Sequence, residues 1–162
     1  MRKRVLILTF ASCVAILAFV RASLFPQSVY TPVFMERPEL EKSVFYDAGA
    51  RELVNPGKIY HRAPYIYVNE KYKGVYVIDN TRPEQPRVEG FIVAPGCMDI
   101  AIKGDILYVD NAVDLVAFDL STRRVTKRVK EVFPEPLSPD GRSYYGSRPD
   151  DYVLVGWKKS NR

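Results

Sequence analysis

The amino-acid sequence predicts an all-β fold made of two four-stranded antiparallel blades, as in an incomplete β-propeller, preceded by an N-terminal signal or anchor helix. Segment 67–69 recurs as 108–110, and segment 75–79 recurs as 115–119. The repeat length of about 40 residues, with four short strands per copy, is typical of propeller blades. The strand interiors are apolar on both alternations, so both sheet faces are expected to be covered. A two-sheet sandwich, the main alternative, would have polar outer faces.

The chain opens with a basic segment and then an apolar one. Three basic residues (2–4) precede the uncharged run 5–20, which is typical of an export signal. That run is short for a bilayer span, which needs about 20 residues. Three fates stay open for residues 1–22: cleavage after Ala22, lipidation of Cys13 in a lipobox-like context, or retention as a membrane anchor. Each fate places the body outside the cytoplasm, in the periplasm, at the outer membrane or at the cell surface.

The net charge argues against a nucleic-acid partner. The whole chain has 24 Lys and Arg residues against 19 Asp and Glu residues, a formal charge of +5. Four of the basic residues lie in the first 22 residues, which leaves 20 basic against 19 acidic side chains in the body. Nucleic-acid binding requires a clustered positive face that neutralises phosphates. The body is close to neutral, so we expect no nucleic-acid partner.

Residues 23–56 are predicted to form an irregular arm, because prolines interrupt this stretch repeatedly. A short helix is expected within it at 38–44. Pro38 suits the first position of a helix, acidic residues follow it, and Leu40 and Val44 share one helical face.

Residues 57–132 are predicted to contain two blade repeats, 57–97 and 98–132. Asp79 and Asp119 end equivalent strands and are expected to cap the turns that follow. The spacing of equivalent residues falls from 41 to 37 along the repeat, because the second long turn is shorter. Alternating apolar runs and turn residues place strands at 57–61, 65–69, 74–79 and 88–93 in the first repeat, and at 98–103, 106–110, 114–119 and 124–132 in the second.

Residues 133–162 are predicted to be a linker rich in proline and glycine followed by a terminal strand at 152–157. The sequence shows no third repeat, whereas stacked repeats usually need about three units to bury their faces. The outer faces must therefore meet the N-terminal arm, the C-terminal strand, a second chain or further sequence. Unpaired blade edges also predict self-association or binding of a partner.

Few residues have catalytic or metal-binding potential. His61 is the only histidine and is interpreted as an edge or turn residue. Asp110, Asn111 and Asp114 are candidate Ca²⁺ ligands, but their spacing is not that of an EF-hand loop. We interpret them as turn-capping residues. The sequence therefore predicts no catalytic residue, no cofactor and no metal site.

Three further groups of side chains are informative. Glu70, Asp99 and Asp110 would support an enzyme if they met in one pocket, and their scattering would oppose it. Cys97 is interpreted as a small buried residue near a strand start, with no disulfide partner in the body. Tyrosines in segments predicted to be irregular are candidates for stacking on sugar rings: Tyr30, Tyr144 and Tyr145.

The chain resembles the LVIVD-repeat proteins, propeller-like envelope proteins of Bacteroidetes type that are usually lipoproteins. The resemblance covers residues 30–157. It implies a propeller-like fold and a place in the cell envelope, but no catalytic residue. Members of the family are typically longer, so this chain is expected to be a short form, a truncated paralogue or a gene remnant. The resemblance is carried by segments 32–35, 39–40, 43–44, 55–60, 68–70, 72–75, 77–80 and 99–104.

Together these observations predict a non-enzymatic β-repeat protein of the cell envelope that acts as an interaction or structural module. Its partner is expected to be an unidentified protein or glycan, and a membrane is contacted through the N-terminal segment. Two alternatives stay open: an envelope enzyme that acts on glycans or peptides, and a remnant of a longer propeller protein.

Overall fold

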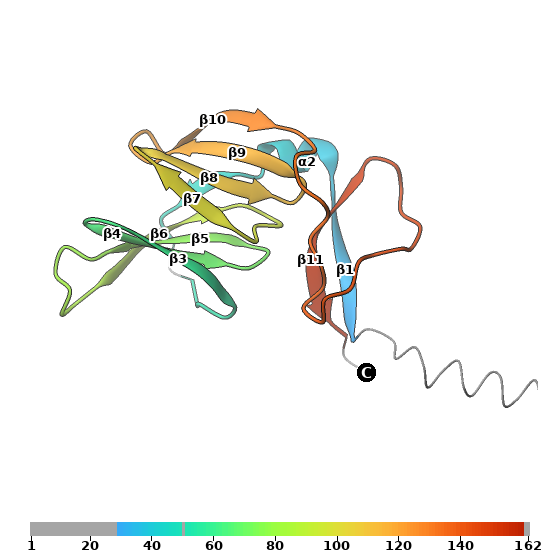
Figure 1. The fold of residues 1–162 in the computed structure, drawn as a ribbon, viewed down its shortest axis with the longest axis horizontal. Helices are drawn as coiled ribbons and strands as arrows, with labels where there is room; N and C mark the ends of the chain where they lie inside the picture. The colour runs from blue at the N-terminus through green and yellow to red at the C-terminus, as the bar shows by residue number, and fades with distance from the viewer. Residues whose placement is uncertain (1–28, 50, 161–162) are drawn as a thin grey trace, which may run out of the picture.

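The computed structural model describes residues 29–49 and 51–160 (Figure 1). Within this part, the chain is mostly β, with one short helix and three antiparallel sheets of five, four and two strands. The expected all-β class is confirmed, and the described residues form no closed propeller. The predicted leader 1–22, with the candidate lipidation site Cys13, lies outside the described residues.

The first sheet contains the first repeat and one additional strand, in the order β2-β6-β5-β4-β3. The strands predicted at 57–61, 65–69, 74–79 and 88–93 are confirmed with nearly the same bounds. We call these four consecutive strands the first meander: β3 (Pro56–Arg62), β4 (Tyr65–Glu70), β5 (Gly74–Asp79) and β6 (Arg87–Val93). A short strand, β2 (Phe45–Asp47), pairs with β6 as the fifth member of the sheet.

The second sheet consists of the second repeat alone, in the order β10-β9-β8-β7. The expected four strands are again present, although the first and last are shorter than predicted. We call them the second meander: β7 (Ile100–Lys103), β8 (Ile106–Asn111), β9 (Asp114–Asp119) and β10 (Arg124–Val129).

Equivalent aspartates cap the turns after the third strand of each meander, as predicted. Asp79 Oδ1 accepts hydrogen bonds from the Thr81 backbone N–H and hydroxyl, and Asp119 Oδ1 accepts from the backbone N–H groups of Ser121 and Thr122. The hydrogen bonds from Thr81 lower the pKa of Asp79, and those from Thr122 and Ser121 lower the pKa of Asp119.

The third sheet is formed by two strands from opposite ends of the described sequence. Their pairing was not predicted. β1 (Tyr30–Glu36) pairs antiparallel with β11 (Tyr152–Lys159) over its whole length. A terminal strand at 152–157 was predicted, and α2 (Arg37–Lys42) confirms a short helix close to 38–44. Within the stretch 23–56 that was predicted to be irregular, β1 and β2 correct the prediction for their own residues, and residues 23–28 lie outside the described part. Pro32 suggested a break, but a two-stranded ribbon tolerates proline because its strands are edges.

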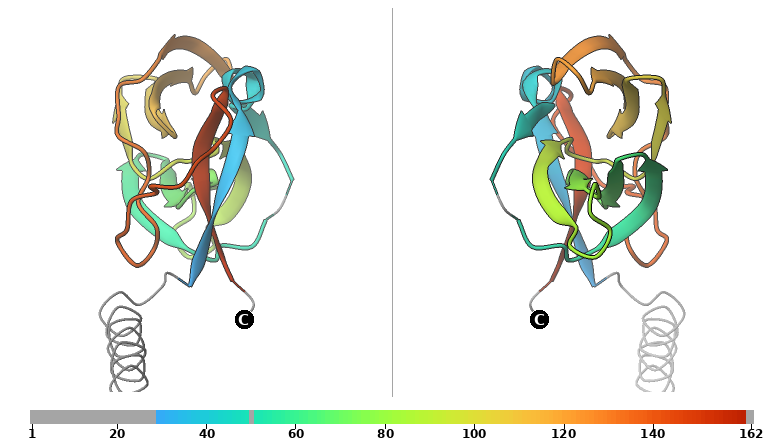
Figure 2. Two further views of the ribbon diagram at one scale, coloured as in Figure 1. Left: turned by 90° about the vertical axis from the view of Figure 1, so that its right-hand side faces the viewer. Right: turned by 90° about the vertical axis from the view of Figure 1, so that its left-hand side faces the viewer.

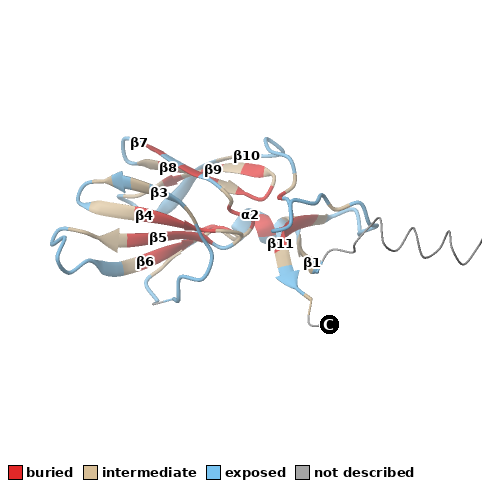
Figure 3. Cartoon of the chain, turned by 60° about the horizontal axis from the view of Figure 1, so that its bottom comes forward, coloured by how far each residue is buried: buried red, intermediate tan, exposed pale blue. Residues whose placement is uncertain are grey.

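The main core lies between the two meanders, which are stacked as two layers beside the β1–β11 ribbon (Figures 1 and 2). Tyr67 and Val75 of the first meander are buried in this core together with Val109 and Val116 of the second. Figure 3 shows the buried residues concentrated along the middle strands of both sheets. Side chains that alternate along a strand point to opposite faces, so each meander has two distinguishable faces.

The two meanders pack against each other through faces that are not equivalent. Both meanders are oriented the same way along the stack. The residue equivalent to Tyr67 in the second repeat is Tyr108, and the one equivalent to Val75 is Leu115. Both lie on the outward side of the second meander, where burial alternates along the strands. We call the Tyr67 and Tyr108 sides the forward faces and the opposite sides the rear faces. The forward face of the first meander therefore packs on the rear face of the second.

Candidate interaction surface

The forward face of the second meander carries an apolar groove of about 490 Å³, here called the outer groove. Its floor is formed by side chains of the second meander, and its wall by the segment 133–137, here called the strap. The residues that line it are mainly apolar: Met98, Asp99, Ile100, Ala101, Tyr108, Asp110, Ala112, Leu115, Phe133, Pro134, Glu135, Pro136 and Leu137.

The strap is held against the protein at both ends. The backbone N–H groups of residues 132 and 133 donate to the carbonyl of Val113. Further along, the Tyr72 hydroxyl donates to the Leu137 carbonyl over 2.7 Å, and the indole N–H of Trp157 donates to the Pro136 carbonyl over 3.0 Å. These bonds fix the wall of the outer groove, while Phe133 and Leu137 keep 38% and 47% of their surface exposed.

Asp110 is one of the three acidic side chains that line the outer groove. Its Oδ1 accepts hydrogen bonds from the backbone N–H groups of Met98 and Asp99, each over 2.9 Å. Burial raises the pKa of the Asp110 carboxyl above its ordinary value, although these bonds favour its charged form. Within the described residues, Asp110 forms no ion pair, whereas Asp99 pairs with Lys58 and Glu135 pairs with Arg148.

The opposite end of the stack, the rear face of the first meander, is already covered. Residues 51–55 lie against it, and the Tyr76 hydroxyl donates to the Glu52 carbonyl over 2.6 Å. The guanidinium of Arg51 lies 4.8 Å from the centre of the Phe91 ring. Glu70 is fully buried and accepts hydrogen bonds from the backbone N–H groups of residues 54 and 55.

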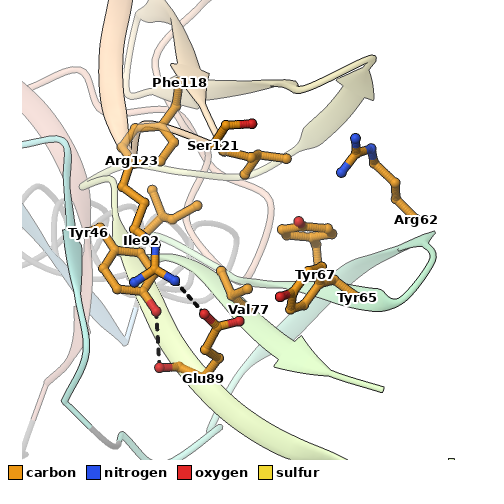
Figure 4. A pocket seen from close by; sticks show the side chains of 11 residues that line it. Tyr46, Arg62, Tyr65, Tyr67, Val77, Glu89, Ile92, Phe118, Ser121 and Arg123 are labelled. Atoms are coloured by element: carbon orange, nitrogen blue, oxygen red, sulfur yellow. Dashed lines mark hydrogen bonds and ion pairs between the residues drawn. The ribbon is translucent and has the colours of Figure 1, made fainter. Parts of the chain in front are cut away.

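A second, polar pocket of about 230 Å³ opens between the two meanders at the end away from the ribbon (Figure 4). Tyr65, Tyr67 and Arg62 lie on one side of it in the figure. Across from them, Arg123 lies 4.1 Å from the centre of the Tyr46 ring and pairs with Glu89. Arg62 pairs with Asp105 across the two meanders. Both cations are thus engaged by carboxylates of the chain.

The three carboxylates that would have marked an enzyme are only partly brought together. Asp99 and Asp110 line the outer groove, and the backbone N–H of Asp99 donates to Asp110. Glu70 lies elsewhere, on the covered rear face of the first meander, where it also pairs with Lys73. His61 lies on the exposed side of β3.

The three candidate Ca²⁺ ligands serve structural contacts instead. Asp114 is fully buried and pairs with Arg37 and Arg128, each over 2.8 Å. Asn111 donates its side-chain amide to the Pro95 carbonyl over 2.6 Å, and Asp110 holds the chain before β7. No cluster of potential metal ligands occurs among the residues described.

Cys97 is completely buried, as predicted, and forms no disulfide. Burial raises the pKa of the Cys97 thiol well above its ordinary value, which makes it a poor nucleophile. The Asn69 amide donates to the Cys97 sulfur over 2.9 Å, a contact that the sequence did not reveal.

The tyrosines proposed for sugar stacking do not form one surface. Tyr30 belongs to β1, which corrects its assignment to an irregular segment. The Tyr144 ring packs edge-on against Phe34, with ring centres 5.1 Å apart, and lies near Trp157. Only Tyr145 of the three is strongly exposed, at 93%.

Comparison with protein-family models, curated proteins and solved structures found no match to this chain. In the part that the structure describes, no helix has the length and apolar character needed to cross a membrane. The outer groove is therefore the leading candidate site on its own geometry. Sequence reasoning identified the unfilled outer face of the repeats but missed the groove, because its wall comes from the strap.

Proposed function

We propose that this chain is a non-enzymatic protein of the cell envelope that acts as an interaction module, built from two blade-like meanders of the LVIVD-repeat type. The direction of stacking is the observation that carries the proposal. Because forward faces pack on rear faces, the arrangement can be extended by another unit, as in a propeller or a solenoid. It ends instead in a forward face that bears an apolar groove. Exposed apolar surfaces of this kind commonly mark interaction sites.

The location outside the cytoplasm is part of the proposal and is supported by the sequence of the leader. Basic residues followed by an apolar run favour export, with cleavage after Ala22, lipidation of Cys13 or retention as an anchor as the three routes. The body would then be presented in the periplasm or at the outer surface, where a protein or glycan partner can reach it. The separation of Glu70 from Asp99 and Asp110 favours this module over a glycan- or peptide-acting enzyme.

Photo-cross-linking in the cells that make the protein tests this function. A photoreactive residue would replace Leu115 in the outer groove, Ile59 on the β3 edge or Tyr145 in the exposed loop, in separate full-length chains. An interaction module gives a discrete adduct from at least one of the three positions, in the envelope fraction. If all three positions give no adduct, or if the protein fractionates with the cytoplasm, the proposed function is wrong.

A further inference from the structure

We infer that the outer groove is a docking site for a β-sheet face of a second, different polypeptide, which presents aliphatic side chains to the groove and a hydrogen-bond donor or cation to Asp110. This inference rests on the proposed function, because it names the partner class of the same module. It follows from a comparison of each position in the outer groove with its equivalent in the first repeat, where the corresponding place is occupied.

The place equivalent to the outer groove is filled by the start of the second meander. On the forward face of the first meander, Ile100 and Ile102 of β7 pack into the shared core with Tyr67 and Val75. The Tyr60 hydroxyl also donates to the Ile102 carbonyl over 3.0 Å. The forward face thus accepts a strand that alternates aliphatic side chains, together with the sheet to which this strand belongs.

After the second meander, the chain first follows the course that it takes after the first meander. It does not go on to form a strand equivalent to β7. After β6, the Ala94 N–H donates to the Lys73 carbonyl, and after β10, the Val132 N–H donates to the Val113 carbonyl. Lys73 and Val113 each precede the third strand of their meander, so both meanders return the chain to the same turn. Residues 133–149 then form no strand, and they leave the equivalent of β7 to be supplied from outside.

Asp110 in the lining of the groove specifies the partner's chemistry. Asn69 occupies the position equivalent to Asp110, and its amide donates to the sulfur and carbonyl of Cys97, in the segment that leads into β7. The Asp110 carboxylate can only accept hydrogen bonds. The partner must therefore offer a donor at the position where Cys97 offers acceptors to Asn69. The N–H groups of Met98 and Asp99 both donate to Oδ1 of Asp110, and the Cys97 thiol also hydrogen-bonds this carboxylate. A carboxylate has about four acceptor sites in all, so it can accept one more donor. Pro134 and Pro136 of the strap have no backbone N–H to offer.

The charge of the groove favours a partner with basic residues over a second copy of this chain. Three acidic residues and no basic residue line it in the part that the structure describes. Asp99 and Glu135 are each paired with a cation of the chain, so Asp110 is the acidic residue of the groove that has no ion pair. Two copies pairing by their outer grooves would bring two Asp110 carboxylates together, which opposes association. If a second copy stacked its rear face on the outer groove, its Pro56, the equivalent of Cys97, would lie opposite Asp110. Proline has no backbone N–H to donate to that carboxylate. That rear face is also already covered by residues 51–55.

The cross-linking experiment distinguishes this inference from the proposed function. We expect the adduct at Leu115 to join a different polypeptide, within a segment that alternates aliphatic residues and contains a Lys or Arg. An adduct with a second copy of this chain, with a glycan or with lipid would overturn the inference. An adduct at Ile59 or Tyr145 but not at Leu115 would also overturn it, and would leave the interaction module standing. No adduct at any position would refute both.

Asp110→Asn tests the donor requirement in the chain that carries the photoreactive residue at position 115. The asparagine keeps the size of the side chain and an acceptor for the N–H groups of Met98 and Asp99. Loss of a charge-assisted hydrogen bond should lower the adduct yield roughly tenfold to a hundredfold. Asp150→Asn, an equal charge change at an exposed site outside the groove, should leave the yield unchanged. Equal yields in the Asp110 variant and the parent chain would refute the role of Asp110.

A steric variant tests the face without changing Asp110. Ala117 lies on the forward face in β9, next to Tyr108 across the strand pair. Ala117→Arg should abolish the adduct at position 115, because the large basic side chain stands where the partner's sheet must lie. Ile59→Arg on the β3 edge, which is 65% exposed, is the matched control and should retain it. Thermal unfolding of the purified full-length variants shows whether a lost adduct reflects unfolding. Retention of the adduct in a folded Ala117→Arg chain would overturn the inference.

Discussion

The two meanders are copies of one unit, yet they differ where the chain enters each unit. At equivalent positions there, one side chain accepts hydrogen bonds and the other donates one. Glu70 accepts N–H groups from residues 54 and 55 before β3. Its equivalent Asn111 donates to the carbonyl of Pro95 before β7. Proline has no backbone N–H, so its partner must be a donor. Both repeats of this chain therefore make a contact at the same position. The residue type at that position depends on whether the facing segment presents a hydrogen-bond donor or an acceptor.

The starts of the third strands differ in a second way. Gly74 has a φ of 145°, and an added Cβ would collide with the Ile92 carbonyl oxygen. Its equivalent Asp114 instead carries a buried carboxylate that joins Arg37 of α2 to Arg128 of β10. The first meander thus closes this corner by close backbone contact, and the second closes it by an ion network that also anchors α2.

The largest stability effect is expected at this network. Asp114→Ala should lower the free energy of unfolding by about 3 kcal/mol, because it leaves two guanidinium groups partly buried without their carboxylate. Arg37 and Arg128 keep 21% and 11% of their side-chain surface exposed, which holds the loss at the lower end of the usual range. Denaturant unfolding of the full chain measures the change. Asp119→Ala, which removes an exposed turn cap, should cost clearly less.

The same network predicts an acid-sensitive contribution. Burial alone raises the pKa of Asp114, but hydrogen bonds from Arg37, the Glu131 N–H and Arg128 bring it below its ordinary value. A lowered folded-state pKa stabilises the fold at pH values above the unfolded pKa. This contribution is lost as the pH falls through the folded value. The stability difference between the parent chain and Asp114→Ala should therefore shrink on acidification, and a constant difference would contradict the assignment.

The next effect is expected where the first meander holds its cover. Glu70→Ala should cost about 2 kcal/mol, because it leaves the N–H groups of residues 54 and 55 without their charged acceptor. Hydrogen exchange at these two amides should accelerate more than exchange in β4 and β5. Glu52→Ala is the control, since Glu52 contributes only its carbonyl to the same cover. Unchanged exchange at residues 54 and 55 would show that Glu70 does not hold this segment.

A smaller effect is expected from the hydroxyl beneath the cover. Tyr76→Phe removes the bond to the Glu52 carbonyl and keeps the ring against Phe91, so it should cost about 1 kcal/mol. Tyr108→Phe on the open forward face should change stability little, since no hydrogen bond of its hydroxyl occurs among the described residues. Equal costs for the two variants, measured by denaturant unfolding, would contradict the contrast between a covered and an open face.

The smallest effect, and one of opposite sign, is expected at the groove. Burial raises the pKa of Asp110, so the folded state disfavours its charged form. That penalty is absent below the unfolded pKa and complete above the folded pKa. Asp110→Asn should therefore be at least as stable as the parent chain at neutral pH, and the two should converge in acid. A melting temperature clearly lower in the variant at neutral pH would show that Asp110 serves folding rather than binding.

The sequence predicted the strands of both repeats because each is a short run of β-branched and aromatic residues bounded by turn residues. Asp79 and Asp119 could be recognised for the same reason, since a turn cap depends on neighbours two or three residues away. β1 could not be recognised, because its partner β11 lies more than a hundred residues later and Pro32 resembles a break. β2 is only three residues long and gains its structure from pairing with β6.

The candidate site was predicted in outline only. The absence of a third repeat indicated an unfilled outer face, but the groove depends on the path of the strap over that face. The pairing of Asn69 with Cys97 gave no local signal, because it joins β4 to the segment before β7 through side chains 28 residues apart. The contrast between Asn69 and Asp110 was visible in the aligned repeats. Its meaning required knowing which side of each strand faces the next unit.

The pairing of β1 with β11 also has a mechanical consequence. Tyr30 lies opposite Lys159, so the outermost residues of both strands sit together at one end of the ribbon (Figure 2). A force applied between these two ends would break the backbone hydrogen bonds between β1 and β11 one pair after another, instead of loading all of them at once. The ribbon should thus yield at low force, while both meanders remain intact behind it as an unbroken tether.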